Sequence, residues 1–286
     1  MKLLVTGADG FTGRHFTAYA RARGHEVSAL QADLKDCDAL HQEIAQAAPE
    51  FVVHLAAISF VGHADAGTFY DVNVIGTLNL LDALAALAQL PRNILLASSA
   101  NVYGNCDQSP ISEEQVPTPV NHYAVSKLAM EHMAGTYLDR LPLFLVRPFN
   151  YTGPGQAESF LIPKLIAHFS RRAETVKLGN LDVEREFNDV RFVCEAYLRL
   201  LEKAKPGEIY NVCTNQPVAL KSVLELLSQL TGHRLQVEVN PTLARSNEIH
   251  RLCGNPAKLK SVIGEIPSPA LQDTLRWMLD HASSTH

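Results

Sequence analysis

Short apolar runs alternate with amphipathic stretches through the first half of the chain. Runs of strand length occur at 1–6, 27–30, 51–57, 94–99 and 143–147, and helical spacing of apolar residues occurs at about 35–47, 68–89 and 122–138. Continuously apolar runs predict strands buried on both faces, which occur in parallel sheets covered by helices. The expected fold is therefore α/β, with a doubly wound parallel sheet.

The regular alternation ends near Pro148. Prolines and glycines cluster at 148–155, and the rest of the chain mixes short helices such as 220–230 with isolated strands such as 235–239. Neither a linker nor an internal repeat marks a boundary. We therefore predict a first domain over 1–150 and a smaller C-terminal α/β lobe over 151–286 that is interleaved with it.

A glycine turn follows the first strand directly. Gly7, Gly10 and Gly13 lead into a stretch at 14–23 that reads as a helix. Strand, glycine turn and helix in this order suit a dinucleotide pyrophosphate, because glycines let the backbone approach the phosphates and the helix N-terminus offers free N–H groups. We therefore expect residues 1–150 to form a dinucleotide-binding domain and the C-terminal lobe to bind the substrate.

Tyr123 and Lys127 lie one helical turn apart in the stretch at 122–138. An ammonium group at this spacing can hold a phenol near its ionised form and make it an acid or base for a hydroxyl or carbonyl group. Alone, such a pair is more often a surface pair. Together with the glycine turn, it predicts hydride chemistry at an alcohol carbon.

Composition is that of a soluble enzyme. The chain has 286 residues, 47% of them hydrophobic, a net charge of −5 and a pI near 6.2, so neither nucleic acid nor an anionic membrane is an expected partner. No apolar stretch reaches transmembrane length, and the first strand leaves no room for a signal peptide. Five scattered cysteines predict reduced thiols and a cytoplasmic location, and twelve histidines without ligand spacing predict no metal site.

Several motifs recur in a fixed order along nearly the whole chain. They are the glycine turn, Asp33-Leu34, His54-Leu55-Ala56-Ala57, Asn73 with Gly76-Thr77, Ser98-Ser99, Val102-Tyr103-Gly104, Tyr123, Lys127 and Arg147-Pro148-Phe149-Asn150. With these motifs the sequence resembles the extended short-chain dehydrogenase/reductases that act on nucleotide-diphosphate sugars, with their Rossmann-like sheet. The stretches 147–156, 185–190 and 210–213 look most like those of GDP-4-keto-6-deoxy-D-mannose reductases and, more distantly, GDP-mannose dehydratases.

The resemblance implies three catalytic residues. Tyr123 would protonate the carbonyl oxygen as hydride arrives from the nicotinamide. Lys127 would lower the pKa of the phenol and bind the nicotinamide ribose, and Ser99 would hold the reacting oxygen. An ordinary hydroxyl at the end of a strand is the alternative interpretation of Ser99.

The resemblance also implies binding residues. Expected at the cofactor are Gly7, Asp9, Gly10, Phe11, Gly13, Arg14, Asp33, Leu34, Leu55, Ala56, Ala57, Ser98, Tyr123, Lys127 and Pro148. Expected at the substrate are Ser59, Asn101, Asn150, Arg185, Arg245 and Glu248. Amide and guanidinium donors match pyrophosphate oxygens. Arg245 is alternatively a solvated surface residue, and Glu248 either contacts the ribose or base or lies on a helix surface.

Ala100 and Asn101 stand where the 4,6-dehydratases of this family carry a carboxylate. Neither is a general acid at neutral pH, so dehydration lacks its proton donor. The function expected is NAD(P)H-dependent reduction of the 4-keto group of a nucleotide-diphosphate 4-keto-6-deoxyhexose, giving GDP-rhamnose or GDP-6-deoxytalose. The alternative is an NAD-dependent nucleotide-sugar 4-epimerase. A non-enzymatic NAD(P) sensor is disfavoured, because Ser99, Tyr123 and Lys127 are all present.

The end of the second strand bears on the cofactor. NAD-binding relatives usually place a carboxylate there on the ribose 2′-hydroxyl, whereas this chain has Leu30-Gln31. The sequence therefore favours NADP over NAD, with Arg14 as a candidate partner of the 2′-phosphate or simply a solvated arginine. The link to Asp33 is too short for a further strand, and Asp33-Leu34 is expected at the adenine.

The segment 71–90 carries more apolar residues than one sheet face should cover. In the family that the sequence resembles, this helix and the helix bearing the catalytic tyrosine pair with their copies. The sequence therefore predicts a homodimer. A helix buried within one chain is the alternative.

Overall fold

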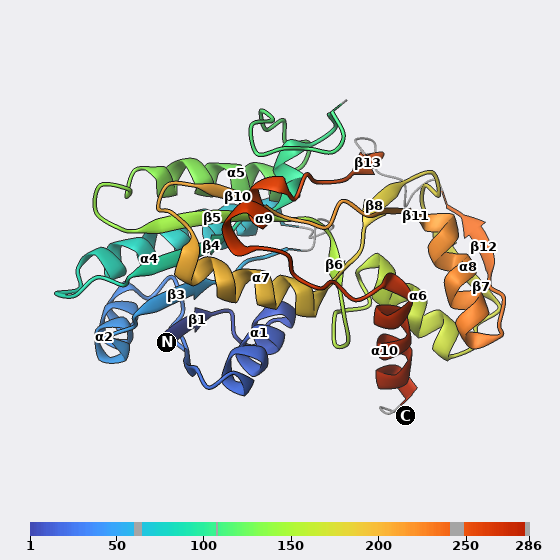
Figure 1. Ribbon diagram of the computed structural model, residues 1–286, viewed down its shortest axis with the longest axis horizontal. Helices are drawn as coiled ribbons and strands as arrows, with labels where there is room; N and C mark the ends of the chain where they lie inside the picture. The colour runs from blue at the N-terminus through green and yellow to red at the C-terminus, as the bar shows by residue number, and fades with distance from the viewer. Residues whose placement is uncertain (60–64, 107, 241–248, 284–286) are drawn as a thin grey trace.

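A six-stranded parallel sheet forms the centre of the computed structural model, which describes residues 1–59, 65–106, 108–240 and 249–283. The strand order is β10-β5-β4-β3-β1-β2, and the strands from β10 to β1 are labelled in Figure 1. These strands are β1 (Lys2–Thr6), β2 (Glu26–Ala29), β3 (Phe51–His54), β4 (Asn93–Ala97), β5 (Leu143–Pro148) and β10 (Ile209–Val212). The predicted α/β fold with a doubly wound parallel sheet is confirmed.

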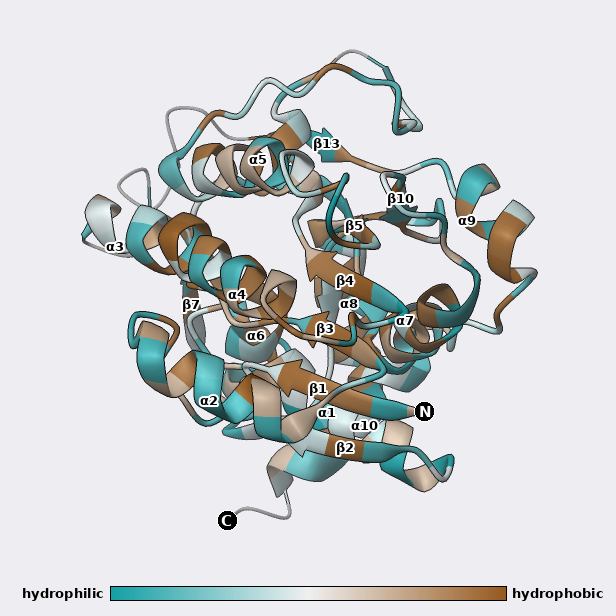
Figure 2. Ribbon diagram, turned by 90° about the vertical axis from the view of Figure 1, so that its left-hand side faces the viewer, coloured by the Kyte–Doolittle hydropathy of each residue, from teal (hydrophilic) through white to brown (hydrophobic). Residues whose placement is uncertain are grey.

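Successive side chains of the central strands enter two different hydrophobic cores. In β1, Leu3 and Val5 belong to one core and Leu4 belongs to the other. Burial on both faces explains the continuous apolar runs, which appear as brown strands between two helical layers in Figure 2. One layer holds α1 (Phe11–Ala22), α7 (Val190–Lys203) and α9 (Ala257–Ile263), and the other holds α2 (Cys37–Ala47), α4 (Gly76–Ala85) and α5 (His122–Gly135).

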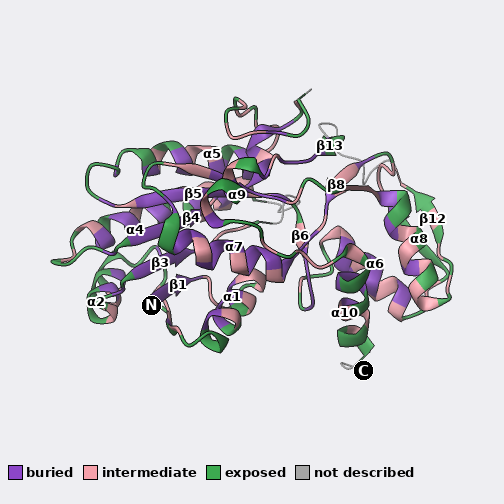
Figure 3. Cartoon of the chain, in the orientation of Figure 1, coloured by how far each residue is buried: buried purple, intermediate pink, exposed green. Residues whose placement is uncertain are grey.

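A smaller lobe lies beside the sheet and has its own buried centre (Figures 1 and 3). It contains α6 (Leu161–Ser170), β7 (Thr175–Leu178), α8 (Leu220–Thr231), β12 (Gln236–Val239) and α10 (Leu271–Ser283). The strand expected alone at 235–239 is not isolated, because β12 pairs in parallel with β7. The division of the chain at residue 150 stays a prediction, and both α7 and β10, from beyond it, belong to the layers of the main sheet.

Short strands connect the lobe to the carboxyl ends of the main sheet. They are β6 (Tyr151–Thr152) with β9 (Asn188–Asp189), and β8 (Glu184–Glu186) between β11 (Pro217–Ala219) and β13 (Arg251–Leu252). The strands expected at 51–57 and 94–99 end earlier than predicted, at His54 and Ala97. Their apolar or small residues continue, but the backbone leaves the sheet at its carboxyl edge and continues as loop and as the 3₁₀ turn η2 (Ala100–Tyr103).

The helix expected at 68–89 is interrupted by a π-helical segment, η1 (Asp71–Ile75), between α3 (Ala66–Tyr70) and α4. Its one buried polar residue is Asn73, whose amide accepts a hydrogen bond from the Ile58 N–H at 2.9 Å and donates to the Ile58 carbonyl at 3.2 Å. The same amide donates to Ser126 Oγ at 2.9 Å. The wide turn thus joins the loop after β3 to α5, and π segments of this kind often occur at functional sites.

A buried histidine on β3 links these groups to β1, and its tautomer follows from its neighbours. Thr6 Oγ1 accepts from two backbone N–H groups, so its own hydrogen is free to donate to His54 Nδ1 at 2.7 Å. Thr77 Oγ1 donates to the Asn73 carbonyl, so it accepts from His54 Nε2 at 2.8 Å. The imidazole is therefore neutral with its proton on Nε2. Burial and the charge of Lys127 lower the pKa of His54 to about 3.

We expect this histidine to make stability depend on acid pH. Between about pH 6.5 and pH 3, His54 is protonated in the unfolded chain but neutral in the folded protein. The free energy of unfolding therefore decreases by about 1.4 kcal/mol for each pH unit by which the pH is lowered in this range. Urea unfolding should show that the stability advantage of the wild type over His54→Gln shrinks with this slope between about pH 6 and pH 4. A difference that stays constant over that range would contradict a neutral, buried His54.

Candidate active site

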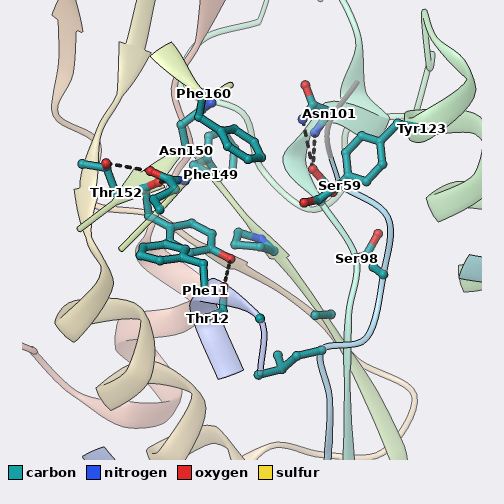
Figure 4. A pocket seen from close by; sticks show the side chains of 18 of the residues that line it. Phe11, Thr12, Ser59, Ser98, Asn101, Tyr123, Phe149, Asn150, Thr152 and Phe160 are labelled. Atoms are coloured by element: carbon teal, nitrogen blue, oxygen red, sulfur yellow. Dashed lines mark hydrogen bonds between the residues drawn. The ribbon is translucent and has the colours of Figure 1, made fainter. Parts of the chain in front are cut away.

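A cleft of about 260 Å³ lies at the carboxyl ends of β1, β3, β4 and β5 (Figure 4). β1 and β3 are neighbours in the sheet, but the chain continues from them in opposite directions, and such a switch point is where ligands bind to open α/β sheets. Predicted site residues that line the cleft are Gly7, Gly10, Phe11, Gly13, Leu55, Ala57, Ser59, Ser98, Ser99, Asn101, Tyr123, Lys127, Pro148 and Asn150.

The glycine turn forms one end of the cleft and admits no side chains at two of its positions. Gly7 has φ +65°, and a Cβ there would lie 2.6 Å from the backbone nitrogen of Ala56. A Cβ on Gly13 would lie 2.1 Å from the Gly7 carbonyl oxygen. Helix α1 begins here with Gly10 as its N-cap, without a side-chain cap and without an acidic residue in its first turn. Its free N–H groups are therefore available to an anion.

Three buried side chains meet at the opposite wall. Tyr123 and Lys127 come from α5, and Ser99 follows β4; their residues are 7%, 4% and 6% exposed. The phenol of Tyr123 lies close enough to the Ser99 hydroxyl for Ser99 to act to lower its pKa, and Lys127 Nζ donates to the Ala97 carbonyl at 2.7 Å. Ser99 Oγ also accepts from the backbone and side-chain nitrogens of Asn101, each at 3.2 Å. The structure thus brings together the phenol, hydroxyl and ammonium groups that the sequence singled out.

The electrostatics of this wall differ from the expectation that Lys127 lowers the pKa of the phenol. Burial raises the pKa of Tyr123, and only the hydrogen bond with Ser99 acts in the opposite direction. Burial likewise lowers the pKa of Lys127 to about 8, with the charge of Glu131 opposing it. Desolvation dominates because both side chains are enclosed between α5 and the sheet, so both groups keep their protons at neutral pH.

The predicted substrate residues are only partly gathered at the cleft. Ser59, Asn101 and Asn150 line it. Arg185 does not, because its guanidinium donates to the carbonyls of Glu184 at 2.9 Å and His250 at 3.0 Å and to that of Ile249. Arg245 and Glu248 lie outside the described residues. A role for any of these residues toward substrate stays a prediction.

Five of the predicted cofactor residues do not line the cleft. They are Asp9, Arg14, Asp33, Leu34 and Ala56. The Arg14 guanidinium donates to the carbonyls of Asp9 at 2.6 Å and Gly155 at 3.0 Å, so pairing with a 2′-phosphate would require it to leave these partners.

A carboxylate does lie at the end of β2, although not from the residue expected in NAD-binding relatives. Glu43 on α2 accepts the backbone N–H groups of Gln31 at 2.8 Å and Ala32 at 2.7 Å. The sequence pattern did not predict this contact, because Glu43 is twelve residues away from Gln31 along the chain. Both Glu43 oxygens accept backbone N–H groups, so this carboxylate is not shown to bind a ribose 2′-hydroxyl as in NAD-binding relatives. The preference for NADP over NAD stays a prediction.

Several lining residues had no role in the sequence analysis. Tyr151 Oη lies 2.7 Å from Thr12 Oγ1, which joins the loop after β5 to the first turn of α1 (Figure 4). The lobe side of the cleft is largely apolar, with Phe149, Phe160, Leu161, Ile162, Phe187 and Leu252. The motif at 147–156 already contained Phe149, Tyr151 and Thr152. The other apolar residues come from three separate segments of the chain, 160–162, Phe187 and Leu252, and only the fold brings these segments together.

A buried carboxylate holds the lobe side in place. Glu186 is fully buried and accepts from the backbone nitrogens of Thr214 at 2.8 Å and Gly254 at 2.6 Å and from Asn188 Nδ2 at 3.0 Å. The backbone nitrogen of Asn188 in turn donates to the Asn150 carbonyl at 2.9 Å. The motif at 185–190 therefore fixes three loops around the cleft.

Neither a membrane span nor a metal cluster occurs in the described ranges. In the part of the chain that the structure describes, no helix combines the length and apolar character needed to cross a membrane. Within the same ranges, no three His, Cys, Asp or Glu side chains are grouped so that they could hold a metal ion. The expected lack of a metal site stays a prediction.

Known proteins similar to this chain include a protein family and two enzymes that act on GDP-6-deoxyhexoses. A model of the NAD dependent epimerase/dehydratase family matches residues 3–213. The chain is 36% identical to the GDP-6-deoxy-D-talose 4-dehydrogenase of Aggregatibacter actinomycetemcomitans, over 92% of each chain. It is also 36% identical to the GDP-6-deoxy-D-mannose reductase of Pseudomonas aeruginosa, over 97% of this chain and 96% of that protein.

Solved structures agree with these relatives. The structure of RMD from Pseudomonas aeruginosa complexed with NADPH superposes with a TM-score of 0.92 at 34% identity and covers 100% of both chains. The UDP-glucose 4-epimerase of Thermus thermophilus in complex with NAD superposes with a TM-score of 0.88 at 28% identity and covers 99% of both chains.

The glycine turn makes a specific prediction. Gly13→Ala should lower the free energy of unfolding by about 1–3 kcal/mol and impair dinucleotide binding, because the new Cβ would meet backbone atoms that cannot move independently. Gly10→Ala is the matched control, since its Cβ would lie 3.2 Å from the same Gly7 carbonyl oxygen. Thermal unfolding and dinucleotide titration of both variants measure this; equal effects would show that the close approach at Gly13 is unimportant.

Proposed function

The chain belongs to the NAD dependent epimerase/dehydratase family, and from this premise we propose that it reduces the 4-keto group of a GDP-4-keto-6-deoxyhexose with NADPH or NADH. The observation that carries the proposal is the meeting of Ser99, Tyr123 and Lys127 in a cleft whose other end is the glycine turn. The names of two relatives of 36% identity, a GDP-6-deoxyhexose reductase and a GDP-6-deoxyhexose 4-dehydrogenase, support this substrate class. The product is GDP-rhamnose or GDP-6-deoxytalose.

The cleft fits a nicotinamide dinucleotide. A side chain at Gly7 would collide with the backbone of Ala56, and one at Gly13 with the backbone of Gly7, so the turn stays compact and a dinucleotide can approach its backbone closely. The N-terminus of α1 has no side-chain cap, and its free N–H groups suit a pyrophosphate. We assign the pyrophosphate to the turn from Gly7 to Gly13, and the nicotinamide ribose to Tyr123 and Lys127. When bound, a reduced dinucleotide supplies a hydride to the substrate carbon.

Tyr123 acts as the acid in this reaction. Because burial raises the pKa of its phenol, the group is protonated at neutral pH and ready to donate to the carbonyl oxygen as that oxygen gains charge. Ser99 holds the oxygen against the phenol. The ammonium of Lys127, one turn along α5, binds the nicotinamide ribose and so orients the dinucleotide toward the phenol.

Two alternatives are less well supported. Dehydration needs an acid after Ser99, and the structure has Ala100, which is buried, and Asn101, whose amide is bonded to Ser99. A 4-epimerase would use the same three residues but must retain its oxidised cofactor. It is distinguished from a reductase by whether reduced cofactor is consumed.

The decisive assay follows the reduced-nicotinamide absorbance with GDP-4-keto-6-deoxymannose as substrate. We expect stoichiometric consumption of NADPH or NADH, and a loss of at least about 10²-fold in turnover for Tyr123→Phe with cofactor affinity nearly unchanged. Tyr70→Phe is the matched control, because its hydroxyl bonds His122 and does not line the cleft. It should turn over like the wild type.

Two outcomes would contradict the proposed reductase mechanism. If freshly purified protein interconverted 4-hydroxy epimers without added cofactor, and consumed no reduced cofactor with the keto sugar, the protein would be assigned as a 4-epimerase. Retention of most activity by Tyr123→Phe would show that another group donates the proton.

We also propose a homodimer that forms through η1, α4 and α5. Leu80, Leu81 and Leu84 of α4 are buried within the chain, but Ile75 is 47% exposed and Val125, on the outer face of α5, is 37% exposed. Burial of these side chains against a second copy would remove them from water.

The dimer is tested by light scattering at micromolar concentration. We expect a mass twice the 31.4 kDa of the chain, and a shift toward the single-chain mass when Ile75→Glu and Val125→Glu are combined, because two carboxylates would be placed at the proposed contact. A single-chain mass for the wild type would contradict the proposal.

A cytoplasmic location without a nucleic-acid or membrane partner completes the proposal. It is supported by the net charge of −5 and by five cysteines that all carry free thiols.

A further inference from the structure

Helix α5 contacts the end of β4 at three successive helical turns. Tyr123 lies beside Ser99, whose hydroxyl acts on its pKa, Lys127 Nζ donates to the Ala97 carbonyl at 2.7 Å, and Glu131 accepts a hydrogen bond from Ser98 Oγ. Residues one turn apart on α5 thus bind three consecutive residues of the chain at the carboxyl end of β4. Glu131 is the member of this set that the reaction described above does not use.

The Glu131 carboxylate is also fixed from β5. Arg147 donates to it twice, from Nε at 2.9 Å and from Nη2 at 2.5 Å, and the two side chains are 4% and 5% exposed. The guanidinium lies 4.8 Å from the ring centroid of Tyr103, whose hydroxyl donates to Asn211 on β10 at 2.7 Å. Neighbouring strands of the sheet therefore determine where this carboxylate lies, because a bidentate pair has one geometry.

Three charges are buried together here, two positive and one negative. Lys127 and Arg147 would repel each other in the low-dielectric interior, and Glu131 offsets that repulsion from one turn further along the helix of Lys127. A neutral side chain could accept the hydrogen bond from Ser98, but a bidentate pair with Arg147 favours an ionised carboxylate. The pair with Arg147 therefore keeps Glu131 negatively charged.

We propose, on the basis of the proposed reductase function, that Glu131 is a positioning residue that acts through Lys127. Anchored by Ser98 and Arg147, its carboxylate fixes α5 against β4 and keeps the Lys127 ammonium charged beside Tyr123.

The other groups around Lys127 agree with this role. Burial lowers the pKa of Lys127 to about 8 and Glu131 raises it. On β3, the neutral His54 brings no charge, and the pKa of His54 is itself lowered partly by Lys127. Tyr123 on the same helix keeps its proton at neutral pH, and Arg147 on β5 is neutralised by Glu131. Among the charged groups that face Lys127 in the described residues, Glu131 is therefore the one that favours its protonated form.

The test is Glu131→Gln, which keeps an amide oxygen for Ser98 and Arg147 but removes the charge. The protonation of Lys127 is read directly from the ¹³Cε resonance that is missing in Lys127→Met. We expect a midpoint near pH 8 in the wild type, and one lower by about one unit or more in Glu131→Gln. The basic limb of kcat/KM should move by the same amount, so that turnover above that limb falls roughly tenfold.

Asp82→Asn is the matched control. Asp82 lies on α4, and its carboxylate accepts the hydroxyl of Tyr137, just beyond the end of α5, at 2.6 Å, so this variant removes a charge next to α5 but at a distance from Lys127. Its Lys127 midpoint should equal that of the wild type. If Glu131→Gln does not fold, Glu131→Gln combined with Arg147→Met leaves no unpaired buried guanidinium. Its Lys127 midpoint should also be lower than that of the wild type, but by less than in Glu131→Gln, because the positive charge of Arg147 is removed as well.

The role of Glu131 and the reductase function fail separately. An unchanged Lys127 midpoint in either Glu131 variant would overturn the role of Glu131, whatever the enzyme does. A shifted midpoint in a protein that reduces no keto sugar would uphold the electrostatic role of Glu131 and overturn the proposed reductase function instead.

Discussion

The contact between α5 and the carboxyl end of β4 is the constraint on which the site depends. A helix that buries apolar residues against a sheet normally keeps its polar side chains in water. Here α5 directs a phenol, an ammonium group and a carboxylate inward against the end of β4, where the ammonium group donates to the Ala97 carbonyl and the carboxylate accepts from Ser98. The site is therefore rigid where the proposed proton transfer occurs, since moving one of these groups would leave a buried polar atom unpaired.

A second set of buried hydrogen bonds aligns the cofactor side of the cleft with this helix. From the Leu55 and Ala56 N–H groups it runs through Thr6, His54 and Thr77 to the Asn73 carbonyl. From the Asn73 amide it continues through Ser126 to the Tyr123 carbonyl. The hydroxyls of Thr6, Thr77 and Ser126 each donate their single hydrogen to one acceptor, so the direction of every hydrogen bond in the network is determined. The loop after β3 and the first turn of α5 are held in register with each other.

The C-terminal half contributes to this centre in two ways. β10 adds a strand beside β5, and its Asn211 accepts the hydroxyl of Tyr103 next to the Arg147 guanidinium. The lobe itself supplies the apolar side of the cleft, held by buried Glu186. One half of the chain therefore carries the polar chemistry, and the other encloses it. A mainly apolar wall opposite a few fixed polar groups is a usual form of a small-molecule site.

The sequence by itself determined the sheet, the glycine turn and the residues at which the chemistry is expected. These are local properties: apolar runs report burial on two faces, glycines report backbone approach, and a spacing of four places Tyr123 above Lys127. The tertiary structure decided what lies around them. Burial, rather than Lys127, controls the pKa of Tyr123, and Arg185 is directed to backbone carbonyls. The partners of Glu131 and the Glu43 contact at β2 join residues distant in sequence, so no local pattern records them.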